Sequence, residues 1–225
     1  MTKCIRRSQS VERTEQLKYL RNSLGATISL SATRAPSRRG QQLVNPQTLY
    51  IALFGRPADP GGLAWLNDIT NGATEYASID VLASSPEFNV ILNSSDDRDN
   101  LDRDYIAQMY QNMFDRPADR EGLEFYLSLH REDGDDLPTI AMKMAAAAGG
   151  VDALTLSAKI EAADLFTSYI DTAAEVKAYE GVWAASFGWD FINGIDAGDP
   201  ALPNFPEYVE AQVELLVSQP GIIVN

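Results

Sequence analysis

The sequence has little of the chemistry on which many enzymes and metal proteins depend. Its 225 residues include one cysteine, Cys4, and one histidine, His130. A single cysteine excludes an internal disulfide, and a single histidine excludes a zinc site built from several Cys and His ligands. No apolar run approaches the roughly 18 residues that indicate a membrane-spanning helix. The composition, with 45% apolar and 22% charged residues, is that of a globular protein.

The formal net charge of −14 is distributed unevenly along the chain. Residues 1–40 contain nine Lys and Arg against two Glu, whereas residues 41–225 contain nine basic and thirty acidic side chains. We therefore predict a basic, flexible N-terminal tail over residues 1–40, followed by an acidic body. Because the body should repel nucleic acid and anionic membrane surfaces, we do not expect it to bind nucleic acid.

One motif occurs twice, at a constant offset of 60 residues. Tyr50–Leu63 (YIALFGRPADPGGL) aligns without a gap with Tyr110–Leu123 (YQNMFDRPADREGL). Between Phe54–Leu63 and Phe114–Leu123, seven of ten positions are identical. Composition alone does not produce such agreement, so the sequence predicts two copies of one supersecondary unit.

Each copy has the pattern of two helices joined at a corner. Apolar residues at helical spacing precede and follow the motif. An arginine suits the end of the first helix, an aspartate caps the second, and a glycine allows close approach at the corner. These structural residues are Arg56, Asp59 and Gly62 in the first copy, and Arg116, Asp119 and Gly122 in the second. Catalysis by Asp59 and Asp119 is the alternative, but a duplicated carboxylate without a partner base in its repeat makes poor chemical sense.

The remaining patterns are also helical, and no alternating strand pattern is present. Capping and apolar signals predict helices within residues 85–92, 139–148, 160–170 and 172–183, and from residue 206 onward. The predicted fold is all-α, with tandem helix–corner–helix repeats over residues 41–150 in a multi-helix bundle. A further C-terminal helical region over residues 151–225 is expected to pack on these repeats. The aromatic residues expected in the core are Trp65, Phe125, Tyr126, Trp183 and Phe187.

Two sets of residues are candidates for binding. Trp183, Trp189 and Asn193 precede or enter a Gly/Asp/Pro loop, where aromatic rings could stack on sugars. The core interpretation is favoured for Trp183 and stays open for Trp189. Calcium, the candidate cofactor, binds six to eight oxygens, and Gly-bearing acidic loops supply some of them. The calcium candidates are Asp133, Asp135 and Asp136, Asp196 and Asp199, and less strongly the cluster within residues 96–102. Solvated loop acids are the favoured alternative.

The doubled motif resembles a bacterial family. The segments LFGRPADPGGLAWL and SSPEF, together with MFDRPADREGLEFYL and LSAKIEAADLFTSYI, resemble the domain-of-unknown-function 4214 family over residues 44–172. The pattern is also similar to the repeats of phycobilisome linker polypeptides. The family is defined without an activity, but the resemblance implies membership of secreted or cell-surface proteins. Such proteins often carry glycine-aspartate calcium-binding repeats and use a one-step export route. This chain contains no such repeat.

The resemblance extends to helical anchoring domains of surface-layer proteins, which bind lipopolysaccharide. It therefore implies a non-enzymatic module, extracellular or on the outer surface of a bacterium. We expect this module to anchor to envelope polysaccharide or lipopolysaccharide, to assemble with itself or other surface proteins, or both. An intracellular linker-like scaffold that binds protein subunits is one alternative. A glycan hydrolase is another, and it would need two carboxylates about 5–10 Å apart in a cleft.

Overall fold

The computed structural model describes residues 45–69 and 101–218, and all regular structure in these two ranges is helical. In chain order the elements are α2 (Pro46–Phe54), α3 (Pro60–Ile69), α6 (Leu101–Phe114), α7 (Arg120–Arg131), α8 (Leu137–Ala147), α9 (Val151–Ser168), α10 (Ala173–Ala178), α11 (Gly181–Ile192), the 3-10 turn η2 (Asp199–Ala201) and α12 (Phe205–Ser218). The predicted all-α fold class is confirmed. The predicted basic tail, the helix at 85–92 and the acidic residues 96–99 lie outside the described residues.

Each repeat is a pair of helices joined by a tight corner. α2 and α3 form the first pair, and α6 and α7 form the second. In both repeats the first helix ends on a phenylalanine, and the next residue turns the chain through the left-handed region. This residue is Gly55 in the first repeat, with φ 64°, and Asp115 in the second, with φ 55°. The two copies of the motif therefore share one backbone path.

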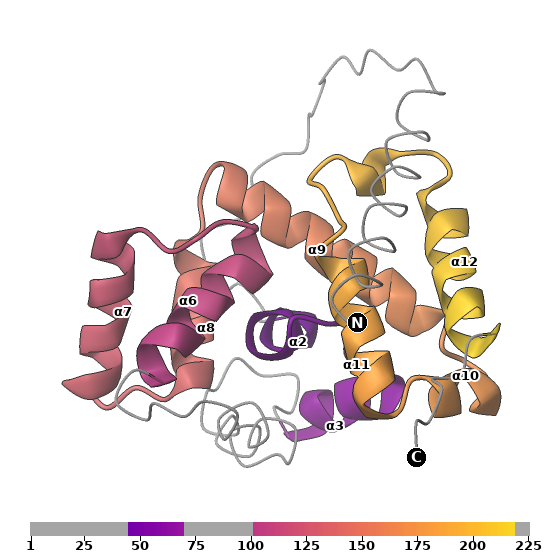
Figure 1. Cartoon of the computed structure of the whole chain (residues 1–225), viewed down its shortest axis with the longest axis horizontal. Helices are drawn as coiled ribbons and strands as arrows, with labels where there is room; N and C mark the ends of the chain where they lie inside the picture. Colours follow the sequence, from indigo (N-terminus) through magenta and orange to yellow (C-terminus); the bar gives the residue numbers. More distant parts are fainter. Residues whose placement is uncertain (1–44, 70–100, 219–225) are drawn as a thin grey trace, which may run out of the picture. The chain divides into compact units, whose positions relative to one another are not determined.

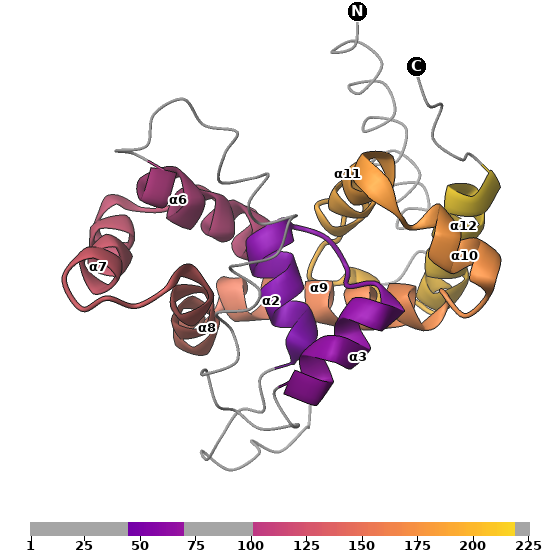
Figure 2. The same ribbon diagram turned by 90° about the horizontal axis from the view of Figure 1, so that it is seen from below.

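Helix α2 forms the centre of the core. It contacts α6, α8 and α9, and lies between α6–α8 on one side and α9 on the other (Figures 1 and 2). The sequence explains this position, because Leu49–Phe54 are apolar without interruption and a helix that is apolar all round is stable only when surrounded. Asn45 caps its start by accepting the N–H of Gln47 at 2.9 Å.

Helix α9 connects the C-terminal helices to the repeats. It contacts both α2 and α6, and α12 packs against α9 and α10. All described residues belong to a unit that spans residues 42–225. The amphipathic stripe predicted within residues 160–170 lies on α9, where Ala162, Ala163 and Phe166 are fully buried.

The prediction of one helix from Thr172 to Trp183 is wrong, because the chain forms two separate helices there. The capping box of Thr172 and Glu175 forms, but α10 ends at Ala178. A new helix begins at Gly181, whose φ of 84° is closed to most side chains. The interruption places the Tyr179 hydroxyl 2.8 Å from the Pro57 carbonyl oxygen, to which it donates.

Two of the expected core aromatics are on the surface. Trp65 is 38% exposed and Phe125 is 56% exposed, whereas Tyr126 is buried as expected. Successive helical residues point about 100° apart, so Tyr126 and Leu127 cannot face α6 and α8 without turning Phe125 outward. Two further aromatic residues were expected in the core, Trp183 and Phe187. Phe187 is buried as expected, whereas Trp183 is half-buried, and its ring centre lies 5.5 Å from that of Phe187.

Candidate functional site

In both repeats the corner is built around the arginine. The Arg56 guanidinium lies over the Tyr50 ring at 5.5 Å, and the Arg116 guanidinium lies over the Tyr110 ring at 5.0 Å. Each arginine also donates through Nη1 to the carbonyl of the following proline, at 2.9 Å and 3.2 Å respectively. The arginines therefore close the ends of α2 and α6 by cation–π contact and hydrogen bonding.

The aspartate and the glycine of the motif complete the corner. Asp59 accepts the N–H of Gly62 at 2.8 Å, and Asp119 accepts that of Gly122 at 2.8 Å. A Cβ on Gly122 would lie 2.3 Å from the Tyr110 hydroxyl, and the same contact in the first repeat would be 2.1 Å. The spacing from tyrosine to glycine thus reflects a close approach that only glycine allows, and both aspartates act as helix caps, as predicted.

The electrostatics of the second corner favour a structural role. The backbone N–H of Gly122, and then the Arg116 guanidinium, lower the pKa of Asp119. A general acid needs a raised pKa to stay protonated near neutral pH, so Asp119 is unsuited to that task. Burial raises the pKa of Tyr110 to about 12, which keeps the phenol neutral.

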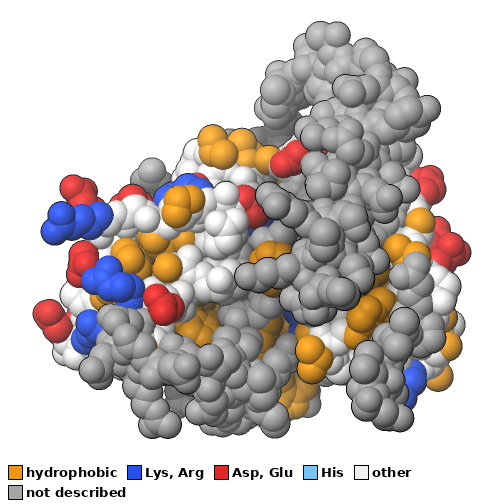
Figure 3. All heavy atoms as spheres, in the orientation of Figure 1, with side chains coloured by type: hydrophobic (Ala, Val, Ile, Leu, Met, Phe, Trp, Pro, Cys, Tyr) orange, Lys and Arg blue, Asp and Glu red, His pale blue; other side chains and the backbone are white. Residues whose placement is uncertain are grey.

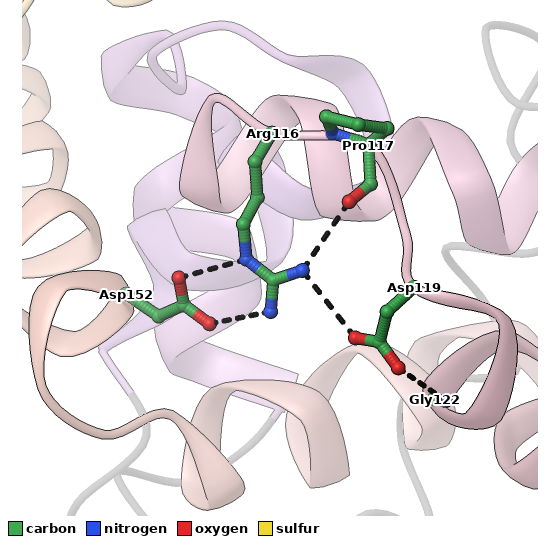
Figure 4. Close-up of polar contacts among 5 residues, drawn as sticks. All are labelled: Arg116, Pro117, Asp119, Gly122 and Asp152. Carbon is green, nitrogen blue, oxygen red and sulfur yellow. Dashed lines mark hydrogen bonds and ion pairs between the residues drawn. The ribbon is translucent and has the colours of Figure 1, made fainter.

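Helix α9 ties the second corner to the C-terminal region. Arg116 binds Asp152 with two parallel hydrogen bonds, Nε to Oδ1 at 3.0 Å and Nη2 to Oδ2 at 2.7 Å, and also reaches Asp119 at 3.4 Å (Figure 4). The hydrogen bond to Asp152 raises the pKa of Arg116. Such bidentate pairs define orientation as well as distance. Asp152 therefore sets how the first turn of α9 meets the corner.

The other end of α9 meets the first corner through a buried polar network. Gln47 donates to the Thr167 hydroxyl at 2.8 Å and to the Ala163 carbonyl at 3.2 Å, and accepts the N–H of Ala58 at 2.9 Å. Thr167 in turn donates to the Ala58 carbonyl at 2.7 Å. A buried network whose groups are all paired specifies one geometry. The two corners are therefore held in register by the two ends of one helix.

The middle of α9 contributes a fully buried cation. Lys159 donates to the Asn112 carbonyl at 2.7 Å and to Asp115 at 2.6 Å, and its side chain has 0% exposure. Burial lowers the pKa of Lys159, and burial also raises the pKa of Asp115. Sequence reasoning singled out neither residue, nor Asp152. The available signal was a lysine at a position of α9 that shares the buried face of Ala162 and Ala163.

The predicted sugar-binding residues are not all brought together. Trp189 is 42% exposed and lies beside Gly55, because a Cβ there would be 2.6 Å from its Cδ1 atom. Asn193 donates to the Trp189 carbonyl at 2.8 Å, and its own Oδ1 is buried without a partner. Trp183 is six residues from Trp189 on α11 and so points about 120° away around the helix. The candidate platform is therefore Trp189 with Asn193.

The predicted calcium ligands have local partners. Asp133 is exposed, Asp135 forms an ion pair with Lys143, and Asp136 caps α8 by accepting the N–H of Thr139 at 2.7 Å. In the second loop Asp199 is buried and accepts the N–H of Asp196 at 2.8 Å. No group of three or more metal-ligating side chains gathers within residues 45–69 and 101–218. Calcium binding therefore stays a prediction.

Substitution of Asp136 separates capping from calcium binding. We expect Asp136→Ala to lower the free energy of unfolding by about 1 kcal/mol, and Asp136→Asn by only a few tenths, because asparagine caps helices well. Urea unfolding with calcium and with a chelator measures both effects. Stabilisation of the unsubstituted chain by calcium, absent in Asp136→Asn, would instead assign Asp136 to a metal site.

The chain matches no family model, and no curated protein or solved structure is significantly similar to it. The resemblance to the domain-of-unknown-function 4214 family therefore stays a prediction based on the doubled motif. Within the described ranges, none of the helices combines the length and the apolarity needed to cross a bilayer.

Proposed function

We propose that the chain is a non-enzymatic attachment module of the bacterial cell surface. In this proposal it docks to envelope polysaccharide or lipopolysaccharide, assembles with copies of itself, or does both. The observation that carries the docking half is Trp189, a large aromatic side chain that is 42% exposed and yet held against the first corner. A ring positioned by a rigid backbone loses little freedom when a sugar stacks on it.

The charge around this platform suggests the chemistry of its ligand. Residues 178–225 contain seven acidic side chains and no Lys, Arg or His. Asp190, next to Trp189 in sequence, is exposed and is a carboxylate, a type of group that accepts hydrogen bonds from sugar hydroxyls. A neutral polysaccharide segment would bind here directly, whereas an anionic one would need a bridging cation such as calcium.

Glycan binding by matched tryptophan variants tests the docking half. We expect Trp189→Ala to weaken binding of the full chain to polysaccharide or lipopolysaccharide about tenfold, because one stacking contact is lost. Isothermal titration at physiological salt, with calcium and with chelator, measures the affinity. Trp65→Ala is the control, since Trp65 is 38% exposed but lies on α3.

Two outcomes of this titration would contradict the docking half. One is equal affinity of Trp189→Ala and the unsubstituted chain. The other is equal weakening by Trp65→Ala, which would indicate that any exposed indole binds the glycan non-specifically. Far-UV circular dichroism of each variant verifies that the helices are intact.

A second set of exposed side chains favours the assembly half. Phe125 on α7 is 56% exposed, and Val151 and Leu154 on α9 are 74% and 61% exposed. Apolar side chains that are this exposed and lie three residues apart on one helix are typical of contact surfaces. Assembly is also what the linker-like scaffold alternative requires, and it does not depend on a glycan.

A further inference from the structure

The two corners share one motif but differ in what covers them. In the first corner Arg56 is 8% exposed and Pro57 is buried. At the equivalent positions of the second corner, the side chain of Arg116 is 37% exposed and Pro117 is exposed. Because the two corners have the same motif and backbone path, the segment that covers the first one shows what the second one can accept.

The first corner is covered by residues 173–192, which form α10 and α11 and are called the covering segment below. The Tyr179 ring centre lies 5.5 Å from the Arg56 guanidinium carbon, and the Tyr179 hydroxyl donates to the Pro57 carbonyl at 2.8 Å. Gly188 then allows α11 to pack directly on the corner, because a Cβ there would be 3.1 Å from Arg56 Cβ and 3.3 Å from Pro57 Cδ. The contact therefore consists of a tyrosine followed by a helix with a glycine on its inner face.

The Arg116 guanidinium has two of the three ring contacts that Arg56 has. The ring centres of Tyr110 and Phe114 lie 5.0 Å and 5.9 Å from its central carbon, and the matching rings of the first repeat lie in the same way around Arg56. Among the residues that the structure describes, none supplies Arg116 with the third ring that Tyr179 gives to Arg56. A further ring on the guanidinium would add a cation–π contact.

The polar contacts of Arg116 lie at its edge and leave room for that ring. Its N–H groups point outward in the guanidinium plane and bind Asp152, Asp119 and the Pro117 carbonyl (Figure 4). From the described residues the Pro117 carbonyl accepts this one hydrogen bond, whereas the Pro57 carbonyl accepts two, the second from a tyrosine hydroxyl. The second corner thus has an open ring position beside an open acceptor.

We propose that the second corner binds a different protein through a tyrosine that precedes a helix, in the way that the covering segment lies on the first corner. The ring of this tyrosine stacks on Arg116, and its hydroxyl donates to the Pro117 carbonyl. The covering segment of a second copy is not available for this contact, because it already lies on the first corner of that copy. The inference therefore depends neither on the glycan nor on self-assembly.

The surroundings of the second corner favour a neutral, apolar contact. Val151 is 74% exposed and lies on the turn of α9 that binds Arg116 through Asp152. Figure 3 shows hydrophobic side chains gathered over the first turns of α9. In the first corner α9 likewise supports the tyrosine, since the ring centres of Phe166 and Tyr179 are 5.3 Å apart. An anionic partner would instead meet the two carboxylates that bind the arginine.

A peptide with the sequence of residues 173–192 is the probe that tests this inference. Fluorescence polarisation of the labelled peptide, titrated with the full chain, measures its affinity. We expect saturable binding that is about fivefold weaker for the Tyr179→Phe peptide, because the hydrogen bond to Pro117 is lost. The Gly188→Leu peptide should bind at least about tenfold more weakly, because its helix cannot approach the corner. Arg116→Lys in the chain keeps the charge but removes the flat guanidinium, and should weaken binding about tenfold.

Photo-cross-linking to the unsubstituted chain locates the bound peptide without any change to the corner. In the first corner Trp189 lies on Gly55, so a peptide with p-benzoylphenylalanine in place of Trp189 should cross-link at the equivalent Asp115 and its neighbours. Cross-links confined to Gly55 and its neighbours would show exchange with the chain's own covering segment and would overturn the inference. Absence of saturable binding would also overturn it, as would equal affinity of the Tyr179→Phe peptide or of the Arg116→Lys chain.

Discussion

Asp115→Asn is expected to lower the free energy of unfolding by about 3–5 kcal/mol, because it removes the counter-charge of a buried lysine. The Lys159 ammonium is 2.6 Å from Asp115, and its side chain has 0% exposure. Asparagine keeps a hydrogen-bond acceptor and tolerates the left-handed conformation at this position, where φ is 55°. The substitution therefore isolates the loss of charge.

Lys159→Met is the matched control and is expected to cost much less. It removes the buried cation itself and leaves Asp115, whose side chain is 33% exposed and can be hydrated, so no buried charge stays unpaired. The Asn112 carbonyl loses a donor in this variant, which costs about 1–3 kcal/mol and is offset by relief of the burial of the ammonium. The double variant should therefore resemble Lys159→Met rather than the sum of the two changes.

The pH dependence of Asp115→Asn has a definite sign. Burial lowers the pKa of Lys159 below its ordinary 10.5, and the charge of Asp115 opposes that shift. Without Asp115 the pKa falls further. Between the folded pKa and 10.5 the unfolded chain binds more protons than the folded chain, so stability rises with pH in that window.

Urea unfolding at a series of pH values checks both expectations. The difference in free energy of unfolding between Asp115→Asn and the unsubstituted chain should be largest near neutral pH. It should become smaller as the pH approaches 10.5. Equal costs for Asp115→Asn and Lys159→Met at neutral pH would show that the charge is not what the pair contributes.

The second large effect is expected at Gly55, where alanine should cost about 2–5 kcal/mol. Its Cβ would lie 2.6 Å from Trp189 Cδ1 and 2.9 Å from Asn112 Oδ1. Overpacking of this kind costs about 1–3 kcal/mol, and the left-handed φ of 64° adds about 1–2 kcal/mol for a residue with a Cβ. Asn112 is 2% exposed and donates to the Ala52 carbonyl at 3.0 Å, so it cannot move aside easily.

Two further variants separate these causes. Gly134→Ala has a φ of 79° and meets no atom within 4 Å, so it should show the backbone cost alone. Adding Trp189→Ala to Gly55→Ala should recover part of the loss by removing the nearest clash. Chemical denaturation of the set measures each step. If Gly55→Ala cost no more than Gly134→Ala, the contact with Trp189 would not be a constraint.

Much of the local structure could be read from residue order, because it depends on neighbours in sequence. The doubled motif predicted both corners, and its caps form as expected at Asp59 and Asp119. The capping box at Thr172 and Glu175 was equally readable. Capping and helical spacing involve residues within about four positions of each other, so they do not depend on how the rest of the chain packs.

Contacts between distant segments were not readable in this way. Tyr110 and Tyr50 share one motif position, yet only the first corner also packs against Tyr179, whose hydroxyl binds Pro57. The equivalent partner of the second corner is Asp152, which binds Arg116. Two repeats with the same motif thus contact different residues, because those contacts come from the C-terminal region.

What the sequence by itself determined is therefore the helical class, the two repeats and their capped corners. Only the tertiary structure decided that Lys159 is buried against Asp115, that Trp189 lies on Gly55 and that Phe125 faces solvent. The physical reason is that a helix pattern indicates which side chains share a face. Which face is covered depends on the helices that pack against it, and these are set by the whole chain.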